Sequence, residues 1–338
     1  MTSRELVLDT LNFCNTNGRI PRQLWTLLWA QEKYGGVIDK IRSDFPDDIS
    51  GADVVLSDPP AKSGHPDIIG TYVDEWGSTF HNIQRGVIGE VKNPQVPTGD
   101  DDWDMAEKIK FPEGLLTFDH DCVNRCCADS PRFMMGGCCP RPFERLQFIR
   151  GTENFYMDLM DPPPKMMEFI RRLHDFYCRK LTLWAKTDVD GLMMMDDWGA
   201  QNNLLISPAI WREMFMPMYK DYIDIAHSHG KKAFMHSDGN ILEIIPYLID
   251  LGLDAVNAQL FCMGIENLAK FKGKITFWGE IDRQHLLPCG TVEDIDRAVK
   301  LVYNTLWDNG GVIAQFEFGP GAKPENAYQI FDTFSKLR

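Results

Sequence analysis

Lys232-Ala-Phe-Met-His236-Ser-Asp238-Gly239 is a short apolar run that ends in a cluster of polar residues. Five other segments of the chain have the same form: residues 133–138, 190–197, 254–259, 275–280 and 312–317. Polar residues at the C-terminal end of each strand, followed by a helix-like stretch, are typical of a parallel barrel whose catalytic groups line one rim. The sequence therefore predicts that residues far apart along the chain meet in one site.

Two further apolar runs, residues 20–25 and 52–57, bring the predicted strands to eight. Pro21 weakens the first of them, because proline cannot donate to a strand ladder. Helical patterns precede or separate the strands, as crossover connections require. They cover residues 2–16, 162–187, 207–230, 240–251, 292–309 and 325–337. The pattern predicts an α/β chain folded as a (β/α)8 TIM barrel.

The chain has 338 residues, a length that one α/β barrel reaches when it carries insertions. We therefore expect residues 1–338 to form a single domain. An insertion is expected between strands 2 and 3, where residues 58–131 are rich in glycine, proline and aspartate. Within it, residues 71–80 and 86–91 alternate as the strands of a hairpin do. A connection of this length is typical of a lid or a partner-docking surface.

The charge of the chain narrows the classes of partner. Asp and Glu number 49 against 35 Lys and Arg, which gives a net charge of -14. This excess of negative charge argues against nucleic acids and anionic membrane surfaces as partners. The N-terminal residues lack the apolar core of a signal peptide, and no run approaches the roughly 18 apolar residues of a membrane span. We therefore expect a cytoplasmic protein whose nine cysteines remain thiols.

His236 and Asp238 lie two residues apart, so an extended strand would direct both toward the barrel mouth. They form a plausible half of a metal site. A zinc ion needs three or four ligands, and Glu317 is the expected third, with Glu280 as the alternate. Imidazole and carboxylates leave a more Lewis-acidic ion than thiolates do, which favours an ether or hydroxyl substrate. The alternative is an acid-base pair of His236 and a carboxylate without metal.

Three further residues are candidates for catalysis. Asp196 follows three methionines, and burial could raise its pKa so that it donates a proton to a leaving oxygen. Helix or turn capping is the alternative for Asp196 and for its neighbour Asp197. Asn257 could orient a substrate or carbonyl, or satisfy loop backbone instead. Glu280 places a charge at the end of the seventh predicted strand.

Three residues are candidates for binding a ligand or cofactor. Trp198 lies near a predicted strand end and could wall an aromatic-sized pocket, although core packing also explains it. Gln259 alternates with Asn257 on the sixth predicted strand, so both project to one side. Gly319 begins a Gly-Pro-Gly segment that could allow a ligand to approach the backbone closely.

Several motifs together resemble a known family. They are Asp74-Glu-Trp-Gly, Arg85-Gly-Val-Ile-Gly-Glu-Val, Arg141-Pro-Phe-Glu-Arg, His236-Ser-Asp-Gly-Asn and Glu317-Phe-Gly-Pro-Gly-Ala-Lys-Pro-Glu-Asn. In this order and spacing they resemble the uroporphyrinogen decarboxylase superfamily, specifically its corrinoid-dependent methyltransferase branch. The resemblance implies a distorted (β/α)8 barrel that moves a methyl group between a small substrate and the cobalt of a corrinoid (cobalamin) carried by a separate protein.

The resemblance also bears on the metal ligands and the substrate. Members of the branch that act on thiols hold zinc with a His-x-Cys motif and a distant cysteine. Here His236 matches the histidine, Asp238 stands where the first cysteine would be, and Glu317 falls near the second. This difference implies an O-demethylase component that takes methyl from a small methoxylated, aromatic compound. The corrinoid protein would enter at the barrel mouth, where residues 58–131 would receive it.

Two other functions remain open at this stage. Decarboxylases of the superfamily act without metal or cofactor and bind tetrapyrrole carboxylates through an N-terminal arginine-rich motif. The corresponding region here keeps Arg19 and Arg22 but lacks the rest of the motif. A non-catalytic barrel that binds a corrinoid or another ligand is the third possibility.

Overall fold

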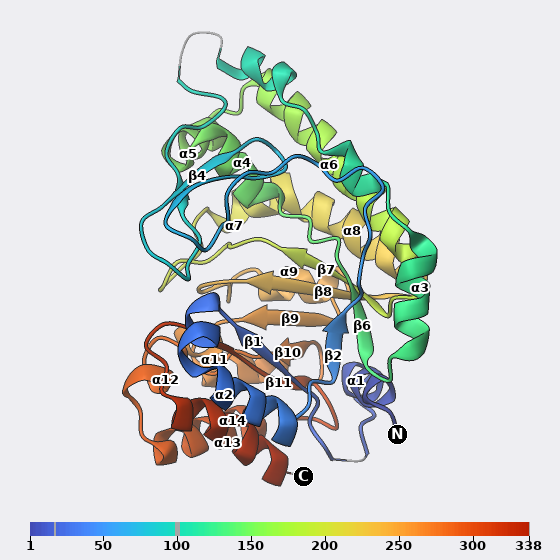
Figure 1. Cartoon of the computed structure of the whole chain (residues 1–338), viewed down its shortest axis with the longest axis vertical. Helices are drawn as coiled ribbons and strands as arrows, with labels where there is room; N and C mark the ends of the chain where they lie inside the picture. Colours follow the sequence, from blue (N-terminus) through green and yellow to red (C-terminus); the bar gives the residue numbers. More distant parts are fainter. Residues whose placement is uncertain (17, 99–101, 338) are drawn as a thin grey trace.

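Eight parallel strands form the centre of the computed structural model, which describes residues 1–16, 18–98 and 102–337 (Figure 1). The strands are β1 (Arg22–Thr26), β2 (Ile49–Gly51), β6 (Phe133–Gly136), β7 (Gly191–Met195), β8 (Lys232–Ser237), β9 (Ala255–Ala258), β10 (Thr276–Trp278) and β11 (Val312–Phe318). They pair in the order β1-β11-β10-β9-β8-β7-β6-β2. The backbone N–H of Asp48, next to β2, donates to the carbonyl of Arg22 at 2.8 Å, so the sheet nearly closes on itself. The predicted (β/α)8 fold is confirmed.

The prediction for the second strand is wrong in position. The strand occupies Ile49–Gly51, whereas residues 52–57 hold only an isolated bridge from Leu56 to Phe118. Ile49 is paired with Phe133 and is 1% exposed in the barrel interior. Val55, which suggested a strand by its β-branched side chain, is 57% exposed. A barrel strand must place an apolar side chain in the interior, and Ile49 meets this condition where Val55 does not.

Helices surround the barrel and close one end of it (Figure 1). The first, α1 (Ser3–Leu11), packs Val7 and Leu11 against apolar side chains of the barrel interior at its N-terminal end. The longer outer helices are α2 (Leu28–Asp44), α3 (His120–Asp129), α4 (Pro142–Arg150), α5 (Thr152–Met160), α6 (Pro164–Ala185), α8 (Met216–Ser228), α13 (Val292–Leu306) and α14 (Pro324–Lys336). Short helices α7 (Pro208–Ile210), α9 (Ile245–Asp250), α10 (Leu260–Met263), α11 (Ile265–Leu268) and α12 (Leu286–Cys289) complete the connections. No helix of the described residues has the length and apolar character needed to cross a bilayer.

Alternation along the strands decides which side chains reach the interior. On β8, Phe234 points into the barrel and Met235 packs outward against the helices. Phe234 shares the interior with residues of the other strands: Ile49, Phe133, Met135, Met193, Ala255, Trp278 and Ile313. Two residues further along, on β8, β9 and β11, the inward positions become polar, as at His236 after Phe234 and Asn257 after Ala255. The apolar core thus ends where a polar rim begins.

The segment between β2 and β6 contains a three-stranded antiparallel sheet of β3 (Gly70–Val73), β4 (Thr79–Asn82) and β5 (Glu90–Val91). It lies beside α4 and α5 (Figure 1). Two contacts attach it to α4. Arg145 donates to the Asp74 carboxylate at 2.5 Å, and the rings of Phe80 and Phe148 are 5.1 Å apart. The inserted sheet is therefore held against the barrel by a buried ion pair and aromatic packing.

Candidate metal and acid-base site

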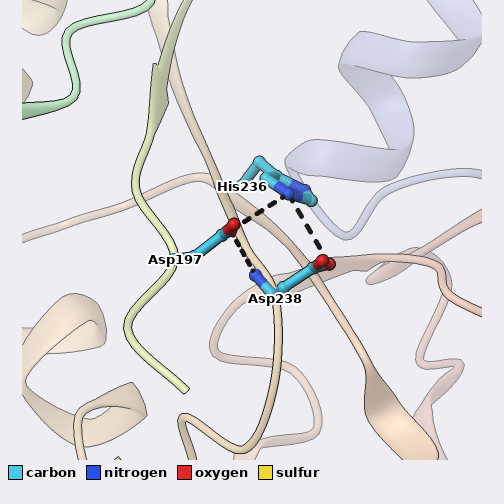
Figure 2. Close-up of side chains that lie close together, drawn as sticks. All are labelled: Asp197, His236 and Asp238. Carbon is cyan, nitrogen blue, oxygen red and sulfur yellow. Dashed lines mark hydrogen bonds and ion pairs between the residues drawn. The ribbon is translucent and has the colours of Figure 1, made fainter. Parts of the chain in front are cut away.

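Three side chains converge at the C-terminal end of β7 and β8 (Figure 2). His236 is the inward residue near the end of β8, and Asp238 lies two positions later. Asp197 lies two residues after Met195, which pairs with His236 across the two strands. The His236 Nε2 atom is 3.5 Å from Asp197 Oδ1 and 3.7 Å from Asp238 Oδ1. The backbone N–H of Asp238 donates to Asp197 Oδ1 at 2.9 Å, which holds the two loops together.

Asn257 orients the imidazole ring. Its Oδ1 lies 2.6 Å from His236 Nδ1, and its Nδ2 donates to the Trp278 carbonyl and, at 2.9 Å, to Gln315 Oε1. Because the amide nitrogen is committed to two acceptors, the oxygen must accept from His236, which therefore carries a proton on Nδ1. Nε2 then faces the two carboxylates. Asn257 is fully buried. It was predicted to orient a substrate, but in the structure it positions His236.

The pKa of His236 shows how strongly the carboxylates act on it. Burial alone lowers the pKa of this histidine, but the interactions with Asp197 and Asp238 outweigh it and raise the pKa to about 9. The pKa of Asp197 is lowered, since the His236 interaction more than offsets the effect of burial. Without a metal, the group is a protonated imidazole beside two carboxylates at neutral pH.

The geometry of the three side chains also fits a metal ion. Two ligand atoms at tetrahedral positions around zinc are separated by about 3.3 Å, close to the 3.5 and 3.7 Å observed around His236 Nε2. Asp238 Oδ1 is buried and has no hydrogen-bond partner among residues 1–16, 18–98 and 102–337. One imidazole and two carboxylates are a hard ligand set that suits zinc or a similar divalent ion. Asp197, His236 and Asp238 are therefore the residues that could hold a metal.

Glu317 has a different partner from the one expected. Arg283, in the loop after β10, donates to Glu317 at 2.7 Å and also pairs with Asp238. Its Nε lies 3.4 Å from Glu280 Oε2. The guanidinium thus occupies the centre of three carboxylates, and Glu317 is not among the three converging residues. Asp197, and not the predicted Glu317, is the second carboxylate beside His236, since Glu317 is bound by Arg283.

Glu280 is buried at 2% exposure, and its Oε2 has no hydrogen-bond partner in the described part of the chain. Burial raises its pKa to about 8, although the Arg283 charge acts in the opposite direction. Glu280 lines a cavity of about 90 Å³ together with Gln259 and Arg283. A carboxylic acid that keeps its proton at neutral pH is a candidate proton donor. Gln259 lies where a ligand could reach it.

Asp196 and Asp197 lie on opposite faces of the chain after β7. Asp196 is fully buried on the outer face, where it accepts from the backbone N–H groups of Phe143 at 3.1 Å and Glu144 at 2.8 Å. It also accepts from the Tyr219 hydroxyl at 3.0 Å. These bonds cap the first turn of α4. Asp196 therefore caps a helix, the alternative considered for it, and does not face the site. Asp197 faces His236 instead.

Trp198 does not line the barrel mouth. It is fully buried, its ring stacks on Phe143 at 4.3 Å, and its Nε1 donates to the Tyr219 hydroxyl at 3.1 Å. It is therefore a core residue, the alternative considered for it. Trp25 instead faces the site, with its ring 5.4 Å from the His236 ring.

Gly319 lies on the rim beside a cavity of about 340 Å³ that Glu317 and Arg283 also line. A Cβ atom at Gly319 would come within 3.1 Å of Leu27 Cδ1. Close packing against Leu27 thus accounts for this glycine without a ligand.

Two residues of the site, Asp197 and Arg283, were not predicted from the sequence. Asp197 could have been found, since it continues the inward series Met193 and Met195 in steps of two. Arg283 gave no such signal, because its position depends on the path of the loop after β10.

Three comparisons with known proteins place the chain among relatives. The uroporphyrinogen decarboxylase (URO-D) family matches residues 82–337. A search of curated proteins gave no match. Among solved structures, a methyltransferase from Methanosarcina mazei superimposes with a TM-score of 0.67 at 11% identity, covering 99% of this chain and 98% of that one. An endo-beta-1,4-xylanase from Gloeophyllum trabeum gives a TM-score of 0.40 at 12% identity, covering 71% and 85%.

Proposed function

The chain belongs to the uroporphyrinogen decarboxylase (URO-D) family, and on that premise we propose that it is a corrinoid-dependent methyltransferase. In this proposal it moves a methyl group from a small methoxylated, aromatic compound to the cobalt of a corrinoid on a separate protein. The observation that carries the proposal is the convergence of Asp197, His236 and Asp238 at the barrel mouth. The methyltransferase from Methanosarcina mazei, which shares the fold over nearly the whole chain, supports it.

Asp197, His236 and Asp238 would hold zinc in this proposal. When bound, zinc would supply a Lewis acid that draws electrons from the ether oxygen of the methyl donor. Asn257 keeps the proton of His236 on Nδ1, so that Nε2 remains free to bind. The Asp238 N–H bond to Asp197 keeps the two carboxylates on one side of the imidazole.

Glu280 is the proposed proton donor, in place of the helix-capping Asp196. Its pKa of about 8 keeps it protonated at neutral pH, and it lines the smaller cavity. Arg283 contacts both Glu280 and the proposed metal ligand Asp238. The reduced corrinoid of the partner would supply the nucleophile that accepts the methyl group. As the bond from methyl carbon to oxygen breaks, the Glu280 proton passes to the departing oxygen, which leaves as a hydroxyl group. Glu280 is left as a carboxylate beside Arg283.

The volumes of the cavities limit which part of the substrate each can hold. The cavity at Glu280 has about 90 Å³, less than the roughly 150 Å³ that holds benzene in an apolar core. Arg283 and Gln284 line both this cavity and the larger one of about 340 Å³. We propose that the methoxy group enters the smaller cavity while the ring lies outside it, at the barrel mouth. Gln259 would contact the methoxy group in the smaller cavity, while Gly319 would remain at the edge of the larger one.

The surface of residues 58–98 and 102–131 is the proposed docking region for the corrinoid protein. Isoleucines at positions 69, 83 and 88 are 63%, 92% and 66% exposed. Large exposed aliphatic groups in one segment are typical of a surface that contacts another protein. This assignment of the segment rests on its exposed side chains and on its attachment to α4.

A metal-free decarboxylase is less well supported. Arg19 and Arg22 lie at the start of β1 and pair with Asp48, with distances of 2.6 and 4.0 Å, at the end of the barrel opposite His236. At the His236 end, Arg283 is already shared by three carboxylates. This arginine is therefore not free to bind the several carboxylates of a tetrapyrrole substrate.

A spectroscopic assay tests the proposed function. The purified protein is loaded with zinc, mixed with a reduced corrinoid protein and offered a panel of methoxyarenes, while the cobalt spectrum is followed. We expect conversion of Co(I) to methyl-Co(III) with at least one donor. Asp197→Asn should abolish the conversion and zinc binding, whereas Asp196→Asn should retain zinc because its side chain faces α4. Absence of any spectral change across the panel would reject the proposal.

A further inference from the structure

A third cavity lies at the side of the barrel mouth, between the inserted sheet and helices α4 and α6. Its volume is about 30 Å³, which is room for about two water-sized groups. Charged side chains dominate its lining: Glu75, Arg141, Arg145 and Lys180. Arg141 connects it to the barrel mouth, since its Nη2 donates at 2.8 Å to the sulfur of Met195, the strand neighbour of His236.

Among the residues that the structure describes, Lys180 has no ion-pair partner. It projects from α6 into this cavity and is partly buried, and it makes no hydrogen bond or ion pair within residues 1–16, 18–98 and 102–337. Burial lowers its pKa. A partly buried ammonium group with three unused donors is costly unless an acceptor reaches it.

The two arginines beside Lys180 also have donors to spare. The Arg141 guanidinium has a thioether, a weak acceptor, as its hydrogen-bond partner, and its nearest carboxylate is that of Glu144 at 3.7 Å. Arg145 is 5% exposed, and its Nε has no hydrogen-bond partner in the described chain, although its Nη1 is bound to Asp74. Three cations thus surround one small space.

Nearby acids neutralise only one of these three cations, since Asp74 pairs with Arg145. Glu75 pairs instead with Lys62 at 3.2 Å. Burial raises the pKa of Glu144 to about 7, so that it carries only part of a charge at neutral pH. The thiol of Cys139, which also lines the cavity, stays neutral because burial raises its pKa. The space therefore has a positive potential and favours an anion.

We propose that Lys180 and Arg141 form a subsite for a carboxylate, and that this carboxylate belongs to the methyl donor. The two oxygens of a carboxylate match a space for about two water-sized groups, and a guanidinium binds both in one plane. Arg141 contacts Met195, the strand neighbour of His236, so a carboxylate held here would direct the rest of its molecule toward the proposed metal ligands. The assignment to the methyl donor rests on the proposed function, whereas carboxylate binding itself does not.

Calorimetric titration without any corrinoid protein tests the subsite. The probes are 4-methoxybenzoate, the neutral 4-methoxybenzamide, and acetate. We expect 4-methoxybenzoate to bind about 10-fold more tightly than the amide. Lys180→Met and Arg141→Gln should each remove this preference while the affinity for the amide stays the same. Lys186→Met, which removes an exposed lysine just after the same helix, should keep the preference, and Lys180→Arg should restore it.

The outcomes separate the subsite from the proposed function. Equal binding of the carboxylate and the amide to the unaltered protein, or a preference that survives in both variants, would overturn the subsite. So would the absence of carboxylate binding to a protein that melts normally. Acetate as tight as 4-methoxybenzoate would keep the anion site but overturn its assignment to the methyl donor. If the protein prefers the carboxylate through Lys180 but transfers no methyl group, the subsite is supported and the proposed function is rejected.

Discussion

The two sides of the barrel mouth differ in the sign of their excess charge: one has more carboxylates than cations, and the other has more cations than carboxylates. Near β8 and β11, one cation, Arg283, is shared by the carboxylates of Asp238, Glu280 and Glu317. Near α4 and α6, three cations surround a cavity to which Glu75 alone contributes a carboxylate. The first side has carboxylates to offer a cation, and the second has donors to offer an anion.

This difference suggests how one substrate could be oriented. A metal ion would be held by the acidic side, at Asp197, His236 and Asp238. A carboxylate would be held by Lys180 and Arg141 on the basic side. Complementary charge at two separated points fixes the direction in which a molecule lies as well as its affinity. The following predictions test each side of this comparison.

The largest effect is expected from His236→Ala on the acidic side. Loss of the imidazole removes one of the three converging groups, so bound zinc should be lost and methyl transfer should fall by about 1,000-fold or more. Metal analysis of the purified variant and the cobalt assay measure the two effects. His229→Ala, which removes an exposed histidine, is the control and should change neither. Retention of full zinc by His236→Ala would show that the acidic side does not hold the metal.

Removing Asp74 from the basic side should lower the free energy of unfolding more than removing Arg283 from the acidic side. Asp74→Ala leaves Arg145 buried and unpaired, which should lower the free energy of unfolding by about 4 kcal/mol. Arg283→Met should cost less, about 2 kcal/mol, because Glu280 and Glu317 have raised pKa values and can take up protons. Urea denaturation at pH 7 measures both. A larger loss for Arg283→Met than for Asp74→Ala would contradict the comparison.

Asn257→Ala should weaken zinc binding by about 10- to 100-fold. The residue holds Nδ1 of His236, so its removal frees the ring to turn away from Asp197 and Asp238. Competition with a chromogenic chelator gives the affinity. The matched control is Asn267→Ala, an exposed asparagine whose amide bonds a helix carbonyl. If both variants bind zinc equally well, Asn257 does not orient the ligand.

The smallest effect concerns the pH dependence of stability. Glu280 has a pKa of about 8 in the folded protein against an ordinary value of 4.5. Between these values the folded protein keeps a proton that the unfolded chain has lost, so the free energy of unfolding falls as pH rises, by up to about 1.4 kcal/mol per unit. Glu280→Gln should remove this contribution. Urea denaturation of the metal-free protein between pH 5.0 and 6.5 isolates it from His236, and parallel slopes for the two proteins would refute the assignment.

Much of the fold could be predicted because it depends on local patterns. Seven of the eight strands lie at or within a residue or two of their predicted positions, since each combines an apolar run with a polar C-terminal end. The exception, β2, buries only Ile49 of its three residues, so it shows no apolar run. The motifs around Arg141, His236 and Glu317 also predicted the family that the later comparison found.

The site was less predictable, since its residues belong to separate loops. Alternation in steps of two could place His236 on the inner side of β8, and it could have placed Asp197 there too. It could not show that Asp196 would cap α4, a helix more than fifty residues earlier in the chain. Glu317 was a reasonable ligand by position, but Arg283 reaches it first.

The sequence by itself determined the barrel, the inward face of each strand and the gathering of polar groups at one rim, because these follow from the periodicity of the backbone. Only the tertiary structure decided which polar groups meet. Arg283 contacts three acidic side chains, whereas Lys180 has no carboxylate partner among the described residues. Loop paths and helix packing bring together residues that no local pattern relates. Charge pairing depends on distances of a few ångströms between remote segments, and those distances are set only when the chain has folded.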